Sequence, residues 1–256
     1  MANWKMNISR REIDRFFERL KALPDDVVNA VDIVVFPPFV YMAQTLNLIK
    51  DSFIKLGVQN IFYEERGAFT GEVSGQMVSE VGAQYVILGH SERRKYFGES
   101  DEVVNKKIKI SLKNHLIPIV CIGENLDQKN QGLTKKVIKD QLMTTTQDLN
   151  GYEIKKILVA YEPIWAISTS EDNKEGKADS PEEVQVIHRY IKKLIGNCYS
   201  EDIAKHTKVI YGGSVNPENV AGFAKMFDID GVLVGSASLS PFKFMKIIEE
   251  FAYKKS

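Results

Sequence analysis

The chain has 256 residues, and its 34 Lys and Arg side chains balance its 34 Asp and Glu side chains. That length suits one large domain, and the balanced charge argues against a general nucleic-acid or membrane-surface binder, which needs a basic excess. No apolar run approaches the roughly 18 residues of a membrane-spanning helix, and the N-terminus lacks the apolar core of a signal peptide. We therefore expect a soluble, cytoplasmic protein.

Short apolar runs alternate with amphipathic segments along the whole chain, as is typical of βαβ units that build a parallel sheet. In the N-terminal half, strands are predicted at 32–36, 54–59 and 85–89. One helix is predicted from Ser9, which has capping-box spacing to Glu12, and another over 39–49, with Val40 on its apolar side. The stretch 60–75 is too long for a simple turn and is suspected of function.

In the C-terminal half, strands are predicted at 116–121, 157–160, 208–211 and 231–234. Helices are predicted over 101–113 and 132–149, and again from Ser180, Asn216 and Ser240. At Ser180 the signal is complete, because proline follows at the first helical position and glutamate at the third.

Counting the segment around Asn3 as a first strand gives eight βα units. We therefore predict that residues 1–256 form a single (β/α)8 barrel domain with a shortened first strand. Polar or glycine-rich residues lie where the strands end, which in such a barrel is the catalytic face. Cys121 and Cys198 fall in apolar-periodic segments and are expected to be buried free thiols. No metal-ligand or disulfide framework is expected.

Glu162 follows the apolar run 157–160 and precedes Pro163, which disfavours helical geometry in the residue before it. A bulky apolar segment, 164–167, comes next. A carboxylate at the end of a buried strand, followed by a hydrophobic flap, is the pattern expected of a general base with a lid. From this stretch alone, a structural carboxylate in an ion pair is an equal alternative.

Three other features could belong to the same site, although each is weak by itself. His90 ends a strand, where a histidine is more often structural than functional. Lys5 lies in a polar segment, where a lysine is more often solvated than catalytic. Gly213 and Gly235 lie in loops after the last two strands, and such loops can bind phosphate through backbone N–H groups. Glycines are also common in ordinary turns.

Six segments, taken together in their order and spacing, identify a protein family far more specifically than any one of them does. They are NWKMN at 3–7, GAFTGE at 67–72, ILGHSERR at 87–94, AYEPIWAI at 160–167, YGGSV at 211–215 and GVLVG at 231–235. Over essentially the whole chain this set resembles the triosephosphate isomerase family, whose fold is the TIM barrel. The resemblance implies a glycolytic and gluconeogenic isomerase that interconverts dihydroxyacetone phosphate and glyceraldehyde 3-phosphate.

The resemblance also implies roles for individual residues. Glu162 matches the family's catalytic base, and His90 matches its electrophile, which in that family is a neutral histidine at a helix N-terminus. Lys5 matches the cation that complements the developing oxyanion. Asn3 matches a polar group that contacts the substrate, and Glu92 matches a supporting residue close to the lysine. The reaction needs no metal and no cofactor.

The same resemblance places the substrate's phosphate and a second subunit. The phosphate would be held by the backbone N–H groups of Ser168, Ser214, Gly235 and Ser236. Residues 163–167 correspond to a closing lid. A homodimer is implied, in which a loop with Thr70 at its tip docks into the second subunit and Glu72 forms an ion pair with Arg93 across the interface.

Three features depart from the family pattern. Ser168 and Ser170 occupy positions that are usually glycine in the lid, and 171–177 lengthens it. Ser236 replaces a glycine, which would add strain if the backbone there had positive φ. The very short first strand predicts a poorly covered seam between the last and second strands.

Two alternatives to the isomerase remain open at this point. The longer lid allows a phosphosugar isomerase of altered substrate range. The departures also allow a catalytically retired barrel that binds phosphate or a partner surface. The intact set of Asn3, Lys5, His90 and Glu162 argues against retirement, because a retired site tolerates the loss of such residues.

Overall fold

The computed structural model describes residues 1–167 and 178–254, so Ser168, Ser170 and the lengthening segment 171–177 lie outside the described residues. The described residues form eight parallel strands that are hydrogen-bonded in sequence order. They are β1 (Ala2–Asn3), β2 (Val34–Phe36), β3 (Lys55–Val58), β4 (Tyr85–Leu88), β5 (Ile117–Ile122), β6 (Leu158–Tyr161), β7 (Lys208–Tyr211) and β8 (Gly231–Val232). This order confirms the predicted (β/α)8 barrel with a short first strand.

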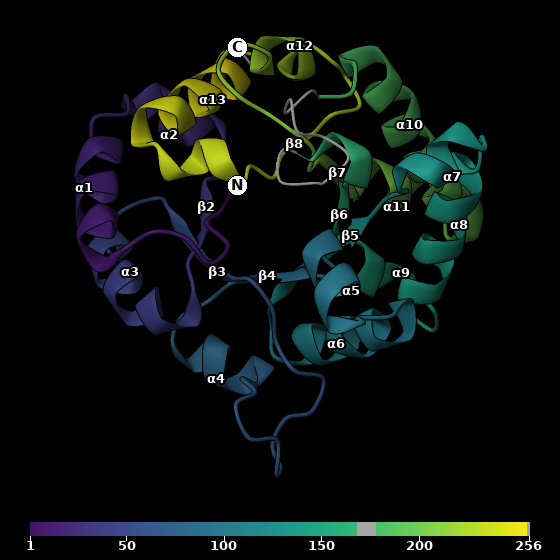
Figure 1. The fold of residues 1–256 in the computed structure, drawn as a ribbon, viewed down its shortest axis with the longest axis horizontal. Coiled ribbons are helices and arrows are strands. Elements are labelled where there is room, and N and C mark those ends of the chain that lie inside the picture. The colour runs from purple at the N-terminus through teal and green to yellow at the C-terminus, as the bar shows by residue number, and fades with distance from the viewer. Residues whose placement is uncertain (168–177, 255–256) are drawn as a thin grey trace.

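Helices surround the strands, as Figure 1 shows. The α-helices of the described residues are α1 (Arg10–Leu20), α2 (Asp25–Ala30), α3 (Met42–Ile49), α4 (Gly75–Glu80), α5 (Ser91–Phe97), α6 (Asp101–Lys113), α7 (Leu126–Asn130), α8 (Thr134–Thr145), α9 (Gly151–Ile154), α10 (Pro181–Cys198), α11 (Glu201–His206), α12 (Val220–Ala224) and α13 (Pro241–Tyr253). Short 3-10 helices are η1 (Phe39–Tyr41), η2 (Ile164–Ala166) and η3 (Ser236–Leu239). In the part of the chain that the structure describes, no helix is both long and apolar enough to cross a membrane.

The two-residue β1 closes the seam of the barrel. Ala2 bridges to Val234, and the Asn3 N–H donates to the Val234 carbonyl over 2.9 Å. The Val234 N–H donates to the Met1 carbonyl over 2.9 Å, and the Met1 amino group donates to the Val232 carbonyl over 3.0 Å. The expectation of a poorly covered seam is therefore wrong where β1 lies, because two residues are enough to connect β2 and β8.

The seam is less complete at the N-terminal ends of the strands. A cavity of about 130 Å³ lies there, with Met1, Ile33, Val232 and Phe244 among its lining residues. These residues come from the chain start, the segment before β2, β8 and α13. The short first strand thus leaves space at the end of the barrel opposite the predicted catalytic face.

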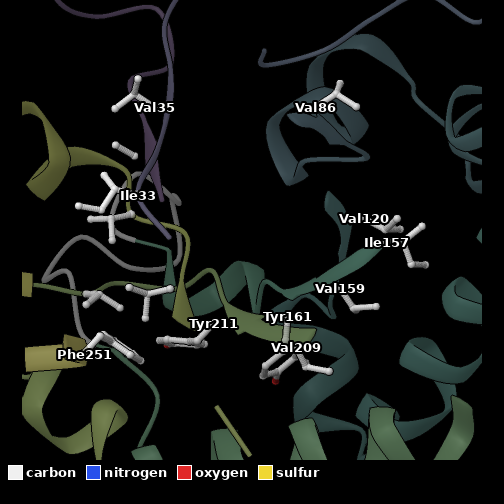
Figure 2. Packing of buried hydrophobic residues seen from close by; sticks show 14 of the residues in the cluster. Ile33, Val35, Val86, Val120, Ile157, Val159, Tyr161, Val209, Tyr211 and Phe251 are labelled. Atoms are coloured by element: carbon white, nitrogen blue, oxygen red, sulfur yellow. The ribbon is translucent and has the colours of Figure 1, made fainter. Parts of the chain in front are cut away.

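The apolar core has two parts because strand residues alternate in direction. Val34 and Phe36 belong to a cluster inside the barrel, and Val35 belongs to the larger cluster between strands and helices. Figure 2 shows members of the larger cluster, including Val86 of β4 and Val209 of β7. The strands thereby become a rigid support whose C-terminal ends can hold polar side chains.

Helix starts with strong sequence signals appear where they were predicted. The Ser9 N–H donates to Glu12 Oε2 over 2.6 Å at the start of α1. Ser180 caps α10, accepting the Glu183 N–H over 3.2 Å. Ser240 caps α13.

Some local predictions are wrong. The helix predicted over 132–149 finishes at Thr145, and Asn150 caps a separate short helix, α9. Val40 is 82% exposed, because η1 interrupts the helical period before α3 begins. Cys121 is buried, whereas Cys198 is exposed at the end of α10.

Candidate active site

Glu162 is placed by the end of β6 and the start of α5. Its N–H donates to the Ile122 carbonyl over 2.8 Å, which continues the pairing of β6 with β5 for one more residue. Its side chain is buried, and Oε2 accepts the Ser91 N–H over 3.2 Å. Ser91 is the first residue of α5, where unpaired N–H groups favour an anionic partner. The carboxylate is therefore held in a defined position, and within the part of the chain that the structure describes His90 is the one basic side chain within ion-pair distance of it.

His90 is the N-cap of α5 and faces Glu162. Its Nδ1 accepts the Glu92 N–H over 3.2 Å. A neutral imidazole that accepts at Nδ1 carries its proton on Nε2. Nε2 lies 3.5 Å from Glu162 Oε1, so this arrangement directs an N–H donor toward the carboxylate and the space beside it.

Lys5 is fixed by its backbone and by its side chain. Its φ of +52° lies in the left-handed region, which is unusual for a residue with a Cβ. The Asn3 side-chain oxygen accepts the Lys5 N–H over 3.1 Å, and the Gln59 amide donates to the Lys5 carbonyl over 2.9 Å. Lys5 Nζ lies 2.6 Å from Glu92 Oε1. A strained turn and an ion pair together aim the ammonium group at the barrel mouth.

These residues converge on one cavity at the C-terminal ends of the strands. The cavity has a volume of about 20 Å³ and is lined by Asn3, Lys5, His90, Glu162, Ile167, Gly212, Gly213, Leu233 and Gly235. A neighbouring cavity of about 330 Å³ shares Asn3, Lys5 and His90. The structure thus brings together the four predicted catalytic residues, and Glu92 lies beside them.

The predicted phosphate-binding groups are placed less uniformly. Gly235 lines the small cavity, and Ser236 begins η3. Ser236 is not among the non-glycine residues with positive φ, so the strain considered from the sequence does not arise. The Ser214 N–H donates to the Ala166 carbonyl over 3.0 Å, and its buried hydroxyl has no partner among the described residues. Ser168 lies outside the described residues.

Two glycines make room for Glu162, and sequence reasoning did not find this role. A Cβ at Gly123 would lie 1.9 Å from the Glu162 carbonyl oxygen, and a Cβ at Gly212 would lie 2.6 Å from Glu162 Cγ. Gly123 follows β5 and Gly212 follows β7, the two neighbours of β6. Their position at strand ends was visible in the sequence, but the approach to Glu162 depends on the sheet order.

The segment after Glu162 is anchored by a buried carboxylate. The Trp165 indole N–H donates to Glu124 Oε1 over 2.9 Å, and the Tyr161 hydroxyl lies 3.2 Å from the same oxygen. The Ile164 N–H donates to the Glu124 carbonyl over 2.9 Å. Burial, with the nearby Glu124 charge, raises the pKa of Tyr161 well above its usual value, so this hydroxyl remains a donor.

The three predicted subunit-contact residues come from two parts of the chain. Thr70 and Glu72 are exposed in the long segment between β3 and α4, which projects from the body of the molecule in Figure 1. Arg93 Nε lies 2.8 Å from Glu99 Oε2 of its own chain. Arg93 also lines the 330 Å³ cavity.

Comparison with known proteins agrees with this geometry. The family model described as "Triosephosphate isomerase" matches residues 1–251. The chain is 43% identical over 246 residues to a protein named "Triosephosphate isomerase" from Caldanaerobacter subterraneus, with 96% of each chain covered. It is 44% identical over 247 residues to a protein of the same name from Endomicrobium trichonymphae, again with 96% of each chain covered. Because the match spans nearly the whole chain at high identity, this chain belongs to the triosephosphate isomerase family.

Proposed function

We propose that this chain is a glycolytic and gluconeogenic isomerase that interconverts dihydroxyacetone phosphate and glyceraldehyde 3-phosphate as a single (β/α)8 domain in the cytoplasm. The observation that carries the proposal is the convergence of Asn3, Lys5, His90 and Glu162 on one cavity at the catalytic end of the barrel. Family membership with relatives at 43–44% identity supports the reaction. No observation favours a retired barrel over an active enzyme.

Glu162 acts as the base that moves the proton. Its carboxylate takes a proton from the carbon next to the substrate carbonyl, and the electron pair moves to the carbonyl oxygen to give an enediolate. The same carboxyl group then returns a proton to the neighbouring carbon. The Ser91 N–H on Oε2 supports this role, because it leaves Oε1 directed at the cavity beside His90.

His90 and Lys5 stabilise the charge that forms on oxygen. The Nε2–H of His90 donates to the enediolate oxygens, since its Nδ1 already accepts the Glu92 N–H. The Lys5 ammonium supplies a positive charge at the same mouth, held there by Glu92 at 2.6 Å. The Asn3 side chain orients Lys5 by accepting the Lys5 backbone N–H, and it contributes a polar group to the cavity. No step in this scheme requires a metal or a cofactor.

Substrate binding requires the cavity to widen. A volume of about 20 Å³ admits about one water molecule and no triose phosphate. Ile167 lines this cavity, and the bond from the Ser214 N–H to the Ala166 carbonyl closes one side of it. We infer that the flap 163–167 moves when substrate enters, releasing the Ser214 N–H for the phosphate beside Gly235 and Ser236. Ser168 completes this set in the proposal, from the family resemblance alone.

The active form is proposed to be a homodimer. The 330 Å³ cavity beside Lys5 has polar, charged and apolar lining residues, and two of the apolar side chains are largely exposed, Met6 at 95% and Phe97 at 69%. The segment between β3 and α4, which carries Thr70, projects from the body of the molecule (Figure 1), and in this proposal it fills the same cavity of a second copy. In such an isologous pair, Arg93 at the cavity wall would face Glu72 of the partner subunit.

The test of the function is isomerisation of glyceraldehyde 3-phosphate by the purified 256-residue chain, coupled to a dehydrogenase that consumes dihydroxyacetone phosphate. Fast turnover that collapses in Glu162→Asp supports both the reaction and the base. A folded protein that binds phosphate but does not turn over either triose phosphate would contradict the proposal. Faster turnover of a different phosphosugar would change the substrate named in the proposal but leave the proposed proton-transfer mechanism in place.

A further inference from the structure

We propose that Lys129 is a positioning residue, which joins the two chain segments that flank residues 168–177 and thereby holds the flap after Glu162 in place. This inference rests on the proposed role of Glu162 and goes beyond it. Lys129 belongs to α7, a short helix that the sequence did not predict and that contributes no residue to the small cavity. Its effect on the reaction would therefore pass through other residues.

On one side, Lys129 contacts the segment that follows Glu162. Its Nζ lies 3.5 Å from the centroid of the Trp165 ring, which is close for a cation over an aromatic face. The indole also has a second partner, because its N–H donates to Glu124 Oε1 over 2.9 Å. Trp165 is therefore held at its face by a cation and at its edge by a buried carboxylate.

Holding Trp165 fixes the neighbours that form the cavity wall. Trp165 lies in η2, between Glu162 and Ile167 along the chain. The carbonyl of the next residue, Ala166, accepts the Ser214 N–H, and Ile167 lines the cavity. A rotation of the indole would disturb both contacts, because η2 is only three residues long.

On the other side, Lys129 contacts the segment that leads into α10. Its Nζ lies 3.6 Å from Asp179 Oδ1 and 3.4 Å from Glu183 Oε2. Asp179 is buried, and its N–H donates to the Tyr211 hydroxyl over 3.2 Å. Lys129 thus connects Trp165 of η2 to Asp179, and the Asp179 N–H connects this cluster to Tyr211, the last residue of β7.

The carboxyl groups in this cluster add a charge that responds to pH. Burial and hydrogen bonding with Glu183 raise the pKa of Asp179 to about 7, against the opposing effect of the Lys129 charge. Among the described residues, the titratable groups that face Asp179 include Lys129 from α7, Glu183 from α10, and the hydroxyls of Tyr161 from β6 and Tyr211 from β7. Above pH 7 the ionised Asp179 strengthens the hold on Lys129, and below pH 7 the proton weakens it.

The experiment compares Lys129→Gln, Lys129→Arg and the unsubstituted 256-residue chain in two independent measurements. The first is steady-state isomerisation. The second is the indole N–H signal of Trp165 in a two-dimensional NMR spectrum, which is simple because the chain has two tryptophans. A Trp165→Phe spectrum assigns the signal. Lys156→Gln is the matched control, since Lys156 lies 4.1 Å over the Tyr152 ring and lines neither of the two active-site cavities.

We expect Lys129→Gln to lower KM about fivefold with kcat within about twofold, because loosening the flap raises the population of the widened, binding-competent form. The Trp165 signal should move, and Lys129→Arg should restore both values, since a guanidinium also stacks on indole and pairs with carboxylates. We expect the wild-type signal to move as pH passes through about 7, and Asp179→Asn to remove that movement.

Two outcomes would overturn the inference. An unmoved Trp165 signal in Lys129→Gln would refute the contact, and a moved signal with wild-type KM would refute the positioning role. Failure of the proposed function is a separate outcome. If the wild-type chain does not isomerise triose phosphates, the Trp165 indole signal still shows whether Lys129 contacts the ring. In that case KM is replaced by the dissociation constant of inorganic phosphate, read from the same spectra.

Discussion

The absent side chain of Gly123 makes room for the backbone of Glu162. A Cβ at Gly123 would lie 1.9 Å from the Glu162 carbonyl oxygen and 2.5 Å from its carbonyl carbon. Real Cβ atoms do not approach backbone so closely, and neither β5 nor β6 can shift easily within the sheet. The position of the proposed base therefore depends on a glycine 39 residues earlier in the chain.

Replacement of Gly123 by alanine should separate activity from folding. We expect Gly123→Ala to lower kcat/KM by about 100-fold or more, since a displacement of about 1 Å at a catalytic group is enough for such a loss. Gly231→Ala is the control, because its Cβ would make only an ordinary contact, 3.4 Å from Ile210. Circular dichroism measures whether both variants fold, and steady-state kinetics measure their kcat/KM. Near-normal kinetics in Gly123→Ala would show that the strand ends can adjust.

Removal of the His90 side-chain donor should slow the chemical step. We expect His90→Ala to reduce kcat by about 10²–10³-fold, as happens when one donor to a developing oxyanion is lost. His90→Gln can retain a donor and should recover part of the loss. Steady-state kinetics at saturating substrate measure both. A kcat within threefold of wild type in His90→Ala would remove His90 from the proposed mechanism.

A buried charge cluster behind the site should contribute strongly to stability. Glu99 is buried, with Lys107 Nζ at 2.6 Å from Oε1 and Arg93 Nε at 2.8 Å from Oε2. Glu99→Gln would leave the buried Lys107 without its anionic partner, so the free energy of unfolding should fall by about 3–5 kcal/mol. Urea denaturation measures it. Asp32→Asn, which breaks an exposed pair with Lys55, should change stability by less than about 1 kcal/mol.

His188 should make the fold sensitive to acid. Burial lowers its pKa to about 4, although the Asp228 carbonyl lies 3.2 Å from Nδ1. The unfolded chain binds a proton at about pH 6.5 and the folded chain only near pH 4, so His188 contributes stability above pH 6.5 that is lost as pH falls toward 4. His188→Gln should flatten the fall in melting temperature between pH 7 and 5. An unchanged slope, equal to that of the exposed-site control His206→Gln, would contradict this assignment.

The strand ends and the strong helix starts could be predicted from the sequence because local chemistry determines them. Pro163 prevents Glu162 from joining a helix, and Ser180 with Pro181 starts α10 wherever the chain goes. The short helices α7, α9 and α11 could not be found, because one turn of helix has no apolar period to detect. Cys198 was misplaced for a related reason, since the apolar period weakens in the last turn of α10.

The candidate site was predicted by resemblance and only in part by pattern. Lys5, His90 and Glu162 belong to three different strand ends, and their spacing along the chain does not predict that they lie close together. The barrel order brings them together, and it also creates contacts without any sequence signal. The Ser91 N–H on Glu162, the space left by Gly123 and the Lys129 contact with Trp165 are of this kind.

The central claim is that Glu162 carries the proton between the two carbons of the substrate. The most direct measurement is incorporation of deuterium from D2O into dihydroxyacetone phosphate, followed by proton NMR with wild type and Glu162→Gln. The account predicts rapid incorporation at the carbon next to the carbonyl by the wild type and a loss of at least about 10³-fold in the variant, with the fold intact. Incorporation by Glu162→Gln at a rate near that of the wild type would contradict the account, because another group would then be the base.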